Sequence, residues 1–345
     1  MIVLSLFNGM NTGRQALENV GIKVDKYYSS EIKPYAIELT QHHFPDTIQV
    51  GDVTKWREWN IDWKTIDLVL SGSPCQDLSA AGKRAGINGS KSSLFFVFVE
   101  ILEHIKSLNP KVLFLQENVG SASKFDVGIM SRALGLYPVR INSSLVTAQL
   151  RDRYYWSNIK TKETMFDIVT DIPQPKDRGI MFKDIITSGT VERVKSTTLL
   201  ESVISSNTFK DSTSEKAQEY FKSRASIGMC SIIYEQNNEL RVKTNTEKGF
   251  DIVTENDCLD LSYPTSTTRR GRVTKGKSPC LMQSSNLLYS YKDGIVRIVN
   301  KVEMCRLQGF PDDYCDILST SKAGSLLGDG WTLPIIEHIF SFIKQ

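Results

Sequence analysis

The sequence predicts an α/β fold with a mostly parallel, doubly wound sheet and a second, smaller domain that is irregular and β-rich. In the first half, short apolar runs alternate with amphipathic helical patterns, which is typical of a parallel sheet covered by helices on both faces. After about Ile159 this alternation stops, and Thr187–Thr213 is rich in serine and threonine without long-range periodicity. A length of 345 residues suits about two domains.

The elements of the sheet domain follow one another along the first half of the chain. Strands are predicted at Ile2–Phe7, Lys26–Ser30, Asp67–Leu70 and Lys111–Leu115. Helices are predicted at Thr12–Val20, Pro34–His43, from Ser93 onward and at Asp126–Leu134. The helix from Ser93 has an apolar face because its apolar residues recur every three or four positions: Leu94, Phe98, Ile101, Leu102, Ile105 and Leu108.

The second half predicts a different organisation. Pro173 and Pro175 mark a linker, and strand-like pieces occur at Cys230–Tyr234 and Leu240–Val242. Helical patterns close the chain at Val302–Gln308 and Leu333–Ile343. We therefore expect a sheet domain at 1–165, a β-rich domain at 166–285, and a return of the chain to the sheet domain at 286–345.

The composition excludes several classes of protein. With 40% hydrophobic and 23% charged residues, the chain is ordinary for a globular protein. No apolar run reaches the roughly 18 residues of a membrane span, and the first residues lack the basic start and cleavage site of a signal peptide. The six cysteines form no CxxC and the four histidines no HExxH, which predicts neither a disulfide framework nor a metal site.

Positive charge is concentrated in one stretch of the second half. Between Leu261 and Lys292 there is no acidic residue, whereas the whole chain has a net charge of only +3. The basic residues there are Arg269, Arg270, Arg272, Lys275, Lys277 and Lys292. Such a segment on a slightly acidic body is typical of a site for a polyanion, and a solvated surface loop is the alternative.

Three predicted strand ends carry residues that suit an adenosine-type ligand. The glycines of Phe7–Gly13 permit a tight turn, and the following helix offers free N–H groups. Glu31 ends the second strand, where a carboxylate can accept from two ribose hydroxyls. Asp52 of the Gly-Asp-Val sequence can accept from the amine of an adenine. Taken singly, the glycine loop is equally compatible with an ordinary strand-to-helix turn, and each acid is more often a solvated loop residue. The three together indicate an adenosine-type cofactor.

The next two strand ends carry groups that can perform chemistry. Cys75 follows Pro74 and precedes a glycine-spaced basic loop with Lys83 and Arg84. A thiol with an ordinary pKa of about 8.5 is a poor nucleophile, but positive neighbours lower that pKa; the alternative is a small buried hydrophobic residue. Glu117 follows an apolar strand, where a carboxyl can hold a raised pKa and donate a proton. Arg151 and Arg153 share one face if their segment is extended.

The order of these motifs resembles that of the cytosine-C5 DNA methyltransferase family. The resemblance spans residues 4–338 and rests on LFNGMNTG, SSEI, GDV, GSPCQDLS, QENV, QLRDRYYWSN, RLQGFP and GDGWTLPII. Details such as the SLFFVF sequence look like the animal de novo type, whereas the length without reader domains looks like a bacterial or phage enzyme. One departure is Asp329-Gly330-Trp331, where most bacterial members have Asn-Ser-Val.

The resemblance implies a class I methyltransferase fold, which is Rossmann-like, with an inserted target-recognition domain. It implies S-adenosyl-L-methionine as the cofactor and S-adenosyl-L-homocysteine as its product. Glu31 is expected at the ribose, and Asp52 and Val53 at the adenine. The full set of cofactor-binding residues implied by the resemblance is Phe7, Asn8, Gly9, Met10, Thr12, Glu31, Ile32, Asp52, Val53, Gly72, Pro74, Leu94, Asp329 and Trp331.

The resemblance also implies a covalent mechanism on a cytosine that is flipped out of the duplex. Cys75 is expected to add to carbon 6 and Glu117 to protonate N3, while Arg153 steadies the base and Arg151 its surroundings. The DNA-binding residues that we expect from the resemblance and from the basic stretch are Ser79, Lys83, Arg84, Arg269, Arg270, Arg272, Lys275 and Lys277.

The expected partner is double-stranded DNA, with the protein a monomer in the cytoplasm of a prokaryotic cell or a phage-infected host. An RNA methyltransferase of the same fold is one alternative, although the long 166–285 insertion speaks against it. A catalytically inactive DNA-binding regulator is the other, and the joint presence of Cys75, Glu117 and Arg153 argues against it. The sequence gives neither the target site nor whether a restriction endonuclease accompanies the protein.

Overall fold

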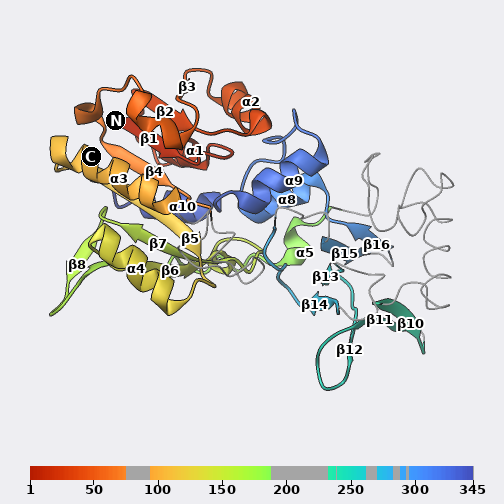
Figure 1. Ribbon diagram of the computed structural model, residues 1–345. Coiled ribbons are helices and arrows are strands. Elements are labelled where there is room, and N and C mark those ends of the chain that lie inside the picture. Colours follow the sequence, from red (N-terminus) through yellow and green to blue (C-terminus); the bar gives the residue numbers. More distant parts are fainter. Residues whose placement is uncertain are drawn as a thin grey trace. The chain divides into compact units, whose positions relative to one another are not determined.

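The structure, a computed structural model, describes residues 1–74, 94–187, 232–237, 239–261, 270–282, 288–292 and 295–344 (Figure 1). The chain divides into two compact units. The first unit comprises Met1–Ser143, Asp152–Lys176 and Gly330–Gln345, and the second comprises Ser144–Arg151 and Asp177–Asp329. The chain therefore leaves the first unit twice and returns to it twice.

The first unit is built on a seven-stranded sheet in the order β3-β2-β1-β4-β5-β7-β6. Its strands are β1 (Ile2–Leu6), β2 (Lys26–Ser30), β3 (Ile48–Gln49), β4 (Leu68–Ser71), β5 (Leu113–Val119), β6 (Val139–Asn142) and β7 (Asp152–Ser157). The pairs from β3 to β5 are parallel, and β7 runs antiparallel to both of its neighbours. The carboxyl ends of β1, β2, β4 and β5 therefore lie at one edge of the sheet.

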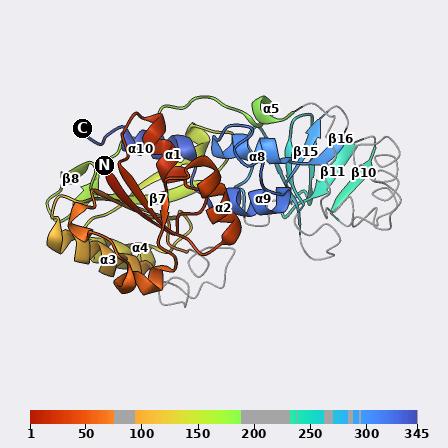
Figure 2. The ribbon, with the colours of Figure 1, turned by 90° about the horizontal axis from the view of Figure 1, so that it is seen from above.

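Helices cover both faces of this sheet, as an alternating α/β sequence requires. They are α1 (Thr12–Asn19), α2 (Pro34–His43), α3 (Leu94–Leu108), α4 (Lys124–Leu134) and α10 (Leu333–Phe340). Figure 2 shows α1 and α10 on one side of the strands and α3 and α4 on the other. The apolar face of α3 is buried with Leu4 and Leu6 of β1 and Phe114 of β5 in one core. The predicted doubly wound, mostly parallel α/β sheet is confirmed.

Two strands at the site differ from the sequence prediction. β5 extends to Val119, beyond the predicted Lys111–Leu115, because it pairs with β7 through Val119 and Arg153. β7 itself begins in a polar sequence that does not look like a buried strand. A short hairpin, β8 (Thr161–Glu163) and β9 (Ile168–Thr170), follows it.

The second unit holds two antiparallel sheets and three helices in the part that the structure describes. One sheet has the order β10-β11-β12 and the other β14-β13-β15-β16. These strands are β10 (Ile233–Gln236), β11 (Glu239–Lys243), β12 (Phe250–Ile252), β13 (Cys258–Asp260), β14 (Arg272–Thr274), β15 (Leu288–Lys292) and β16 (Ile295–Ile298). The helices are α5 (Phe182–Ile185), α8 (Lys301–Gln308) and α9 (Thr320–Asp329).

The strands of the second unit enclose a small core of their own. Ile232, Val242, Leu259 and Tyr289 are almost completely buried in it. Helix α8 begins with a capping box, in which Asn300 Oδ1 accepts from Glu303 N and Glu303 Oε2 accepts from Asn300 N. Over the described ranges, no helix is long and apolar enough to cross a membrane, and no group of three His, Cys, Asp or Glu could hold a metal.

Candidate active site

The loop that joins β1 to α1 has an unusual backbone. Phe7, Gly9 and Asn11 have φ angles of 56°, 59° and 64°. Glycine and asparagine tolerate this left-handed region better than other residues do, which explains their choice here. The loop is fixed to the end of β2 because Asn8 N donates to Ser30 O (3.1 Å) and Gly9 N donates to Glu31 Oε2 (2.8 Å).

The Glu31 carboxylate is oriented by three backbone donors. Its Oε1 accepts from Ile32 N (2.8 Å) and Lys33 N (2.9 Å), and its Oε2 accepts from Gly9 N. Each carboxylate oxygen has two lone pairs, so Oε2 can accept one more hydrogen bond from a ligand hydroxyl. The next side chain, Ile32, is 70% exposed and presents apolar surface beside this carboxylate.

Asp52 and Val53 stand together at the start of a 3₁₀ segment, η1 (Val53–Glu58). Asp52 Oδ1 accepts from Thr54 N (2.9 Å) and Thr54 Oγ1 (2.8 Å). The backbone hydrogen bond from Thr54 is the main cause that lowers the pKa of Asp52, which keeps this exposed carboxylate ionised. Val53 is buried.

A buried amide without partners in the described part of the chain shows that this region fits a bound polar ligand such as a cofactor. Asn11 is completely buried, yet neither its amide nitrogen nor its amide oxygen has a hydrogen-bond partner among the described residues. A buried amide without partners is costly, and a bound polar ligand would relieve that cost. At the end of β4, a β-carbon on Gly72 would stand 2.8 Å from Nε1 of Trp331, so only glycine lets this indole lie against the strand end.

The other residues predicted at the cofactor belong to several different elements. Met10 and Thr12 are buried in the loop and in the first turn of α1, and Leu94 begins α3. Asp329 ends α9 and belongs to the second unit, whereas Trp331 belongs to the first.

A buried ion pair joins two of the predicted catalytic residues. Arg153 Nε lies 2.8 Å from Glu117 Oε1, and the two side chains are only 13% and 11% exposed. Arg153 also donates from Nη1 to the carbonyl of Asp152 (2.8 Å). The two residues meet because β5 and β7 pair antiparallel, with Glu117 opposite Tyr155 and Val119 opposite Arg153. The carboxylate is thus held in one orientation by a neighbouring strand.

Ser73 ties the end of β4 to the residues on both sides of Glu117. Its Oγ accepts from Gln116 Nε2 (2.9 Å) and from Asn118 Nδ2 (3.4 Å), and Gln116 Nε2 also donates to Glu117 O (2.8 Å). Ser73 is not among the site residues predicted from the sequence. Its position, two residues before Cys75 at a strand end, is the signal that could have found it.

Four predicted site residues in the stretch 75–93 lie outside the described residues: Cys75, Ser79, Lys83 and Arg84. Pro74 is the last described residue before them and lies directly after Ser73. The structure therefore defines the backbone that leads to Cys75.

Arg151 makes different contacts from Arg153. Its side chain is buried within the second unit, where Nη1 donates to Leu281 O (3.1 Å) and contacts Cys280 Sγ (3.1 Å). Its Nη2 donates to Gly328 O (3.1 Å). These bonds fix backbone segments of the second unit.

The basic side chains between Leu261 and Lys292 differ in their exposure and in their protein contacts. Arg270 and Arg272 are exposed, and Arg269 lies outside the described residues. Lys275 is exposed as well, but its Nζ donates to Ile252 O (3.0 Å) and Thr254 Oγ1 (2.9 Å) and pairs with Asp257. Lys277 Nζ donates to three backbone carbonyls, those of Ser144, Thr147 and Ile180.

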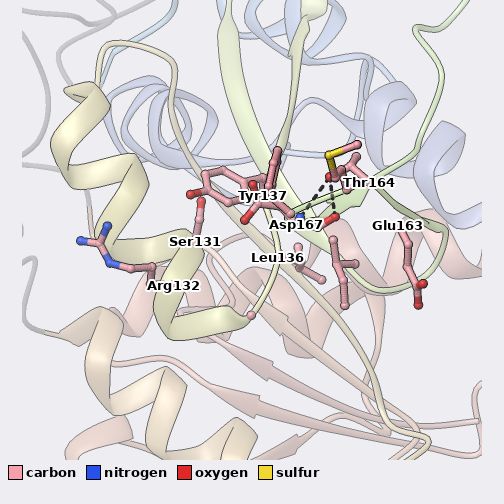
Figure 3. Close-up of a pocket in the computed structure, with 11 residues that line it drawn as sticks. Ser131, Arg132, Leu136, Tyr137, Glu163, Thr164 and Asp167 are labelled. Atoms are coloured by element: carbon pink, nitrogen blue, oxygen red, sulfur yellow. Dashed lines mark hydrogen bonds between the residues drawn. The ribbon is translucent and has the colours of Figure 1, made fainter.

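A hollow of about 410 Å³ lies in the first unit (Figure 3). Figure 3 shows the last turn of α4 on one side of it and the β8–β9 hairpin on the other. Thr164 Oγ1 donates to Asp167 O (2.8 Å) at the tip of this hairpin. None of the predicted site residues lines the hollow, whose lining is Ser131, Arg132, Gly135, Leu136, Tyr137, Glu163, Thr164, Met165, Phe166, Asp167 and Ile168.

Solved structures share the fold of the whole chain. EhMeth of Entamoeba histolytica is 14% identical and superposes with a TM-score of 0.57, covering 100% of this chain and 99% of its own. A mutant of Spodoptera frugiperda DNMT2 is 16% identical and has a TM-score of 0.53, with 99% of each chain covered.

Sequence relatives come from bacteria and phages. The orphan methyltransferase M.SPRI of Bacillus phage SPR is 34% identical over 173 residues, which are 46% of this chain and 37% of M.SPRI. The type II methyltransferase M.NgoBV of Neisseria gonorrhoeae is 37% identical over 120 residues, 34% of this chain and 27% of M.NgoBV. The chain thus spans about a third of the length of these two relatives. The type II methyltransferase M.HpaII of Haemophilus parainfluenzae is 26% identical over 347 residues, covering 97% of this chain and 86% of M.HpaII.

A family model describes the chain from end to end. The model for C-5 cytosine-specific DNA methylases matches residues 1–345, which confirms the resemblance predicted from the ordered motifs. The chain belongs to the C-5 cytosine-specific DNA methylase family.

Proposed function

We propose that the protein is a DNA (cytosine-5-)-methyltransferase that transfers a methyl group from S-adenosyl-L-methionine to carbon 5 of a cytosine in duplex DNA. The observation that supports this most directly is the buried Glu117–Arg153 pair, joined through Gln116 and Asn118 to Ser73 just before Cys75. The chemistry needs a carboxyl group and a thiol; Glu117 lies in β5, and Cys75 follows β4, the parallel neighbour of β5, by four residues in the sequence.

The cofactor supplies a methyl group activated by a sulfonium centre. We propose that Glu31 accepts hydrogen bonds from its ribose, with the exposed Ile32 packing beside the adenine. Asp52 accepts from the adenine amine, and the amide of Asn11 takes up polar groups of the amino-acid end. Gly72 and Trp331 form part of the wall, together with the remaining predicted residues Phe7, Asn8, Gly9, Met10, Thr12, Val53, Pro74, Leu94 and Asp329.

Carbon 5 of cytosine is a weak nucleophile, so the ring must first be activated. In the proposed reaction the Cys75 thiolate adds to carbon 6, and Glu117 delivers a proton to N3. Carbon 5 then attacks the methyl group, with S-adenosyl-L-homocysteine as the leaving group. Water takes the proton from carbon 5 and the thiolate leaves carbon 6, while the N3 proton returns to Glu117, which gives 5-methylcytosine. Arg153 holds the Glu117 carboxyl in place and steadies the base.

The cytosine cannot react inside the duplex, so it must be flipped out, which costs a few kcal/mol. Ser79, Lys83 and Arg84 are proposed to hold the extruded nucleotide and its backbone. We assign target recognition to residues 166–285, with Arg269, Arg270 and Arg272 as its DNA contacts. Lys275 and Lys277 are left out of this set because their ammonium groups already bind protein acceptors.

The relatives are bacterial and phage proteins, which supports a proposal for the cellular setting. We propose that the protein acts as a monomer in the cytoplasm of a bacterium or of a phage-infected host. Since the relatives include both type II and orphan methyltransferases, pairing with a restriction endonuclease is one of two arrangements that they represent.

The proposal is tested by incubating the protein with S-adenosyl-L-methionine that carries a labelled methyl group. We expect label in 5-methylcytosine of duplex DNA and none in tRNA. Label in tRNA alone would identify an RNA methyltransferase, and DNA binding without any transfer would identify a regulator. Bisulfite sequencing of the modified DNA then gives the target sequence.

A further inference from the structure

The segment Ser144–Arg151, called here the connecting segment, has an unusual place in the chain. The residues before and after it belong to the first unit, whereas the segment itself belongs to the second. It leads directly into β7, and a single residue, Asp152, separates its last residue from Arg153. Contacts that hold the connecting segment in place therefore also hold the backbone of Arg153, the ion-pair partner of Glu117.

Gln149 joins the connecting segment to the residues that follow Lys277. The two backbones form a parallel bridge, in which Leu150 N donates to Ser278 O (2.9 Å) and Ser278 N donates to Ala148 O (2.7 Å). The completely buried Gln149 side chain accepts from Leu281 N (2.8 Å). The same side chain donates to Leu307 O (3.0 Å) of α8. Together with the buried Arg151 guanidinium, these bonds hold one end of the segment.

Lys277 holds the other end. Its ammonium group donates to Ser144 O (2.9 Å) and Thr147 O (3.1 Å) in the connecting segment, and to Ile180 O just before α5. A lysine ammonium has three donors, so three carbonyl acceptors can use all of them. Desolvation lowers the pKa of Lys277 from its ordinary value, as expected for an ammonium group taken out of water. A lysine that met phosphates would keep its donors at the surface.

We propose that Lys277 is a positioning residue for methyl transfer, which holds the connecting segment and through it Arg153, and is not a phosphate contact. The inference rests on the proposed function. Lys277 is the third residue after the end of β14, the strand that begins with the exposed Arg272. In this proposal the segment 272–277 has two roles. Arg272 contacts DNA, and Lys277 holds the backbone that leads to Arg153.

The test compares Lys277→Met with Lys183→Met, which removes an equal charge from an exposed lysine of α5 in the same unit. Two quantities are measured at saturating cofactor: the single-turnover rate on bound DNA, and DNA affinity across a salt series. We expect Lys277→Met to lower the rate on the order of 10- to 100-fold, because small misplacements of reacting groups have effects of this size. The salt dependence of DNA binding should equal that of Lys183→Met.

Two additions separate positioning from a general loss of folded protein. Titration with duplex containing 5-fluorocytosine counts the molecules able to react, and the rate is expressed per such molecule. Lys277→Arg retains N–H donors for the carbonyls and should recover most of the rate. If Lys277→Met does not fold, Lys277→Gln, which keeps one amide donor group, serves in its place with the same expectation of a slower single turnover.

Two results would overturn the inference. One is a normal single-turnover rate with a salt slope smaller by about 0.9 than that of the control, the mark of one lost phosphate contact. The other is wild-type behaviour in both measurements. Failure of the proposed function is a separate outcome, since the unaltered protein would then transfer no methyl group to DNA before any variant is compared.

Discussion

Ser73, just after β4, is linked by side-chain hydrogen bonds to β5, the strand that carries Glu117. One hydroxyl accepts from the side chains on either side of the glutamate, and it lies two residues before Cys75. Removing it leaves two buried amide groups with fewer partners. Its effect should therefore appear in both the stability of the first unit and the rate of methyl transfer.

Ser73→Ala is expected to cost about 1 kcal/mol of unfolding free energy, the usual net contribution of a hydrogen bond. The single-turnover rate should fall as well, because the chain that leads to Cys75 is less well fixed. Urea unfolding and single-turnover assays measure the two effects. Ser107→Ala, at an exposed serine that bonds only to His104 O, is the control. Equal behaviour of the two variants would contradict a role for Ser73.

Glu117→Gln tests the proton donor. The amide keeps a hydrogen bond but cannot deliver a proton, so the rate of transfer should fall on the order of 10²- to 10⁴-fold, the typical range for general acid catalysis. DNA affinity should change little. A near-normal single-turnover rate would show that another group protonates the cytosine ring.

At the scale of single elements, the end of α8 shows how a charged pair depends on pH. Arg306 donates to Asp312 from Nε (2.7 Å) and Nη2 (2.6 Å), and these hydrogen bonds hold the pKa of Asp312 below its ordinary 3.8. A carboxyl whose pKa is lower in the folded state stabilises the fold at pH values above its unfolded pKa. That contribution is lost as the pH falls through the lower, folded value.

Asp312→Asn should therefore destabilise the protein at neutral pH by at most about 1 kcal/mol, because the Asp312 side chain is half exposed and water screens the pair. The difference from the unaltered protein should shrink as the pH falls below 3.8. Urea unfolding at a series of pH values measures this difference. A difference that stays constant down to about pH 3 would rule out the ion pair as its cause.

The elements also show what could be predicted from the sequence and what could not. The apolar spacing that predicted a helix from Ser93 corresponds to α3, because a one-sided apolar pattern has one way to be buried. β7 was missed, since its polar start becomes a strand only by pairing with β5 and β6. For the same reason the ion pair between Glu117 and Arg153 could not be predicted from the local sequence. The acceptors of Lys277 lie 97 to 133 residues away, so composition could suggest only a surface charge.

At the scale of the whole molecule, the first unit is assembled from three separate pieces of chain. Its last piece returns to the first, where α10 packs against α1 and Asn19 Nδ2 donates to Glu337 Oε1 (2.6 Å). The same returning piece brings Trp331 to Gly72 at the end of β4.

The exposed arginines of the insertion should make DNA binding sensitive to salt. Arg272→Ala is expected to lower the slope of log affinity against log salt by about 0.9 if it meets a phosphate. If it reads a guanine edge, its loss should instead cost about 1–3 kcal/mol at one base position and relax specificity there. Titrations on target and non-target duplexes distinguish the two. Behaviour equal to that of Lys183→Ala on both duplexes would exclude contact of Arg272 with DNA.

Covalent addition of the Cys75 thiolate to cytosine is tested by trapping the protein on DNA with 5-fluorocytosine at the target position. Fluorine cannot leave as a proton does, so a thiolate that has added to carbon 6 stays bound after methyl transfer. We predict a covalent protein–DNA complex that forms only with S-adenosyl-L-methionine and does not form with Cys75→Ser. Methyl transfer to ordinary DNA by Cys75→Ser, or the absence of a trapped complex with the unaltered protein, would contradict the proposal that Cys75 adds to carbon 6 of the cytosine.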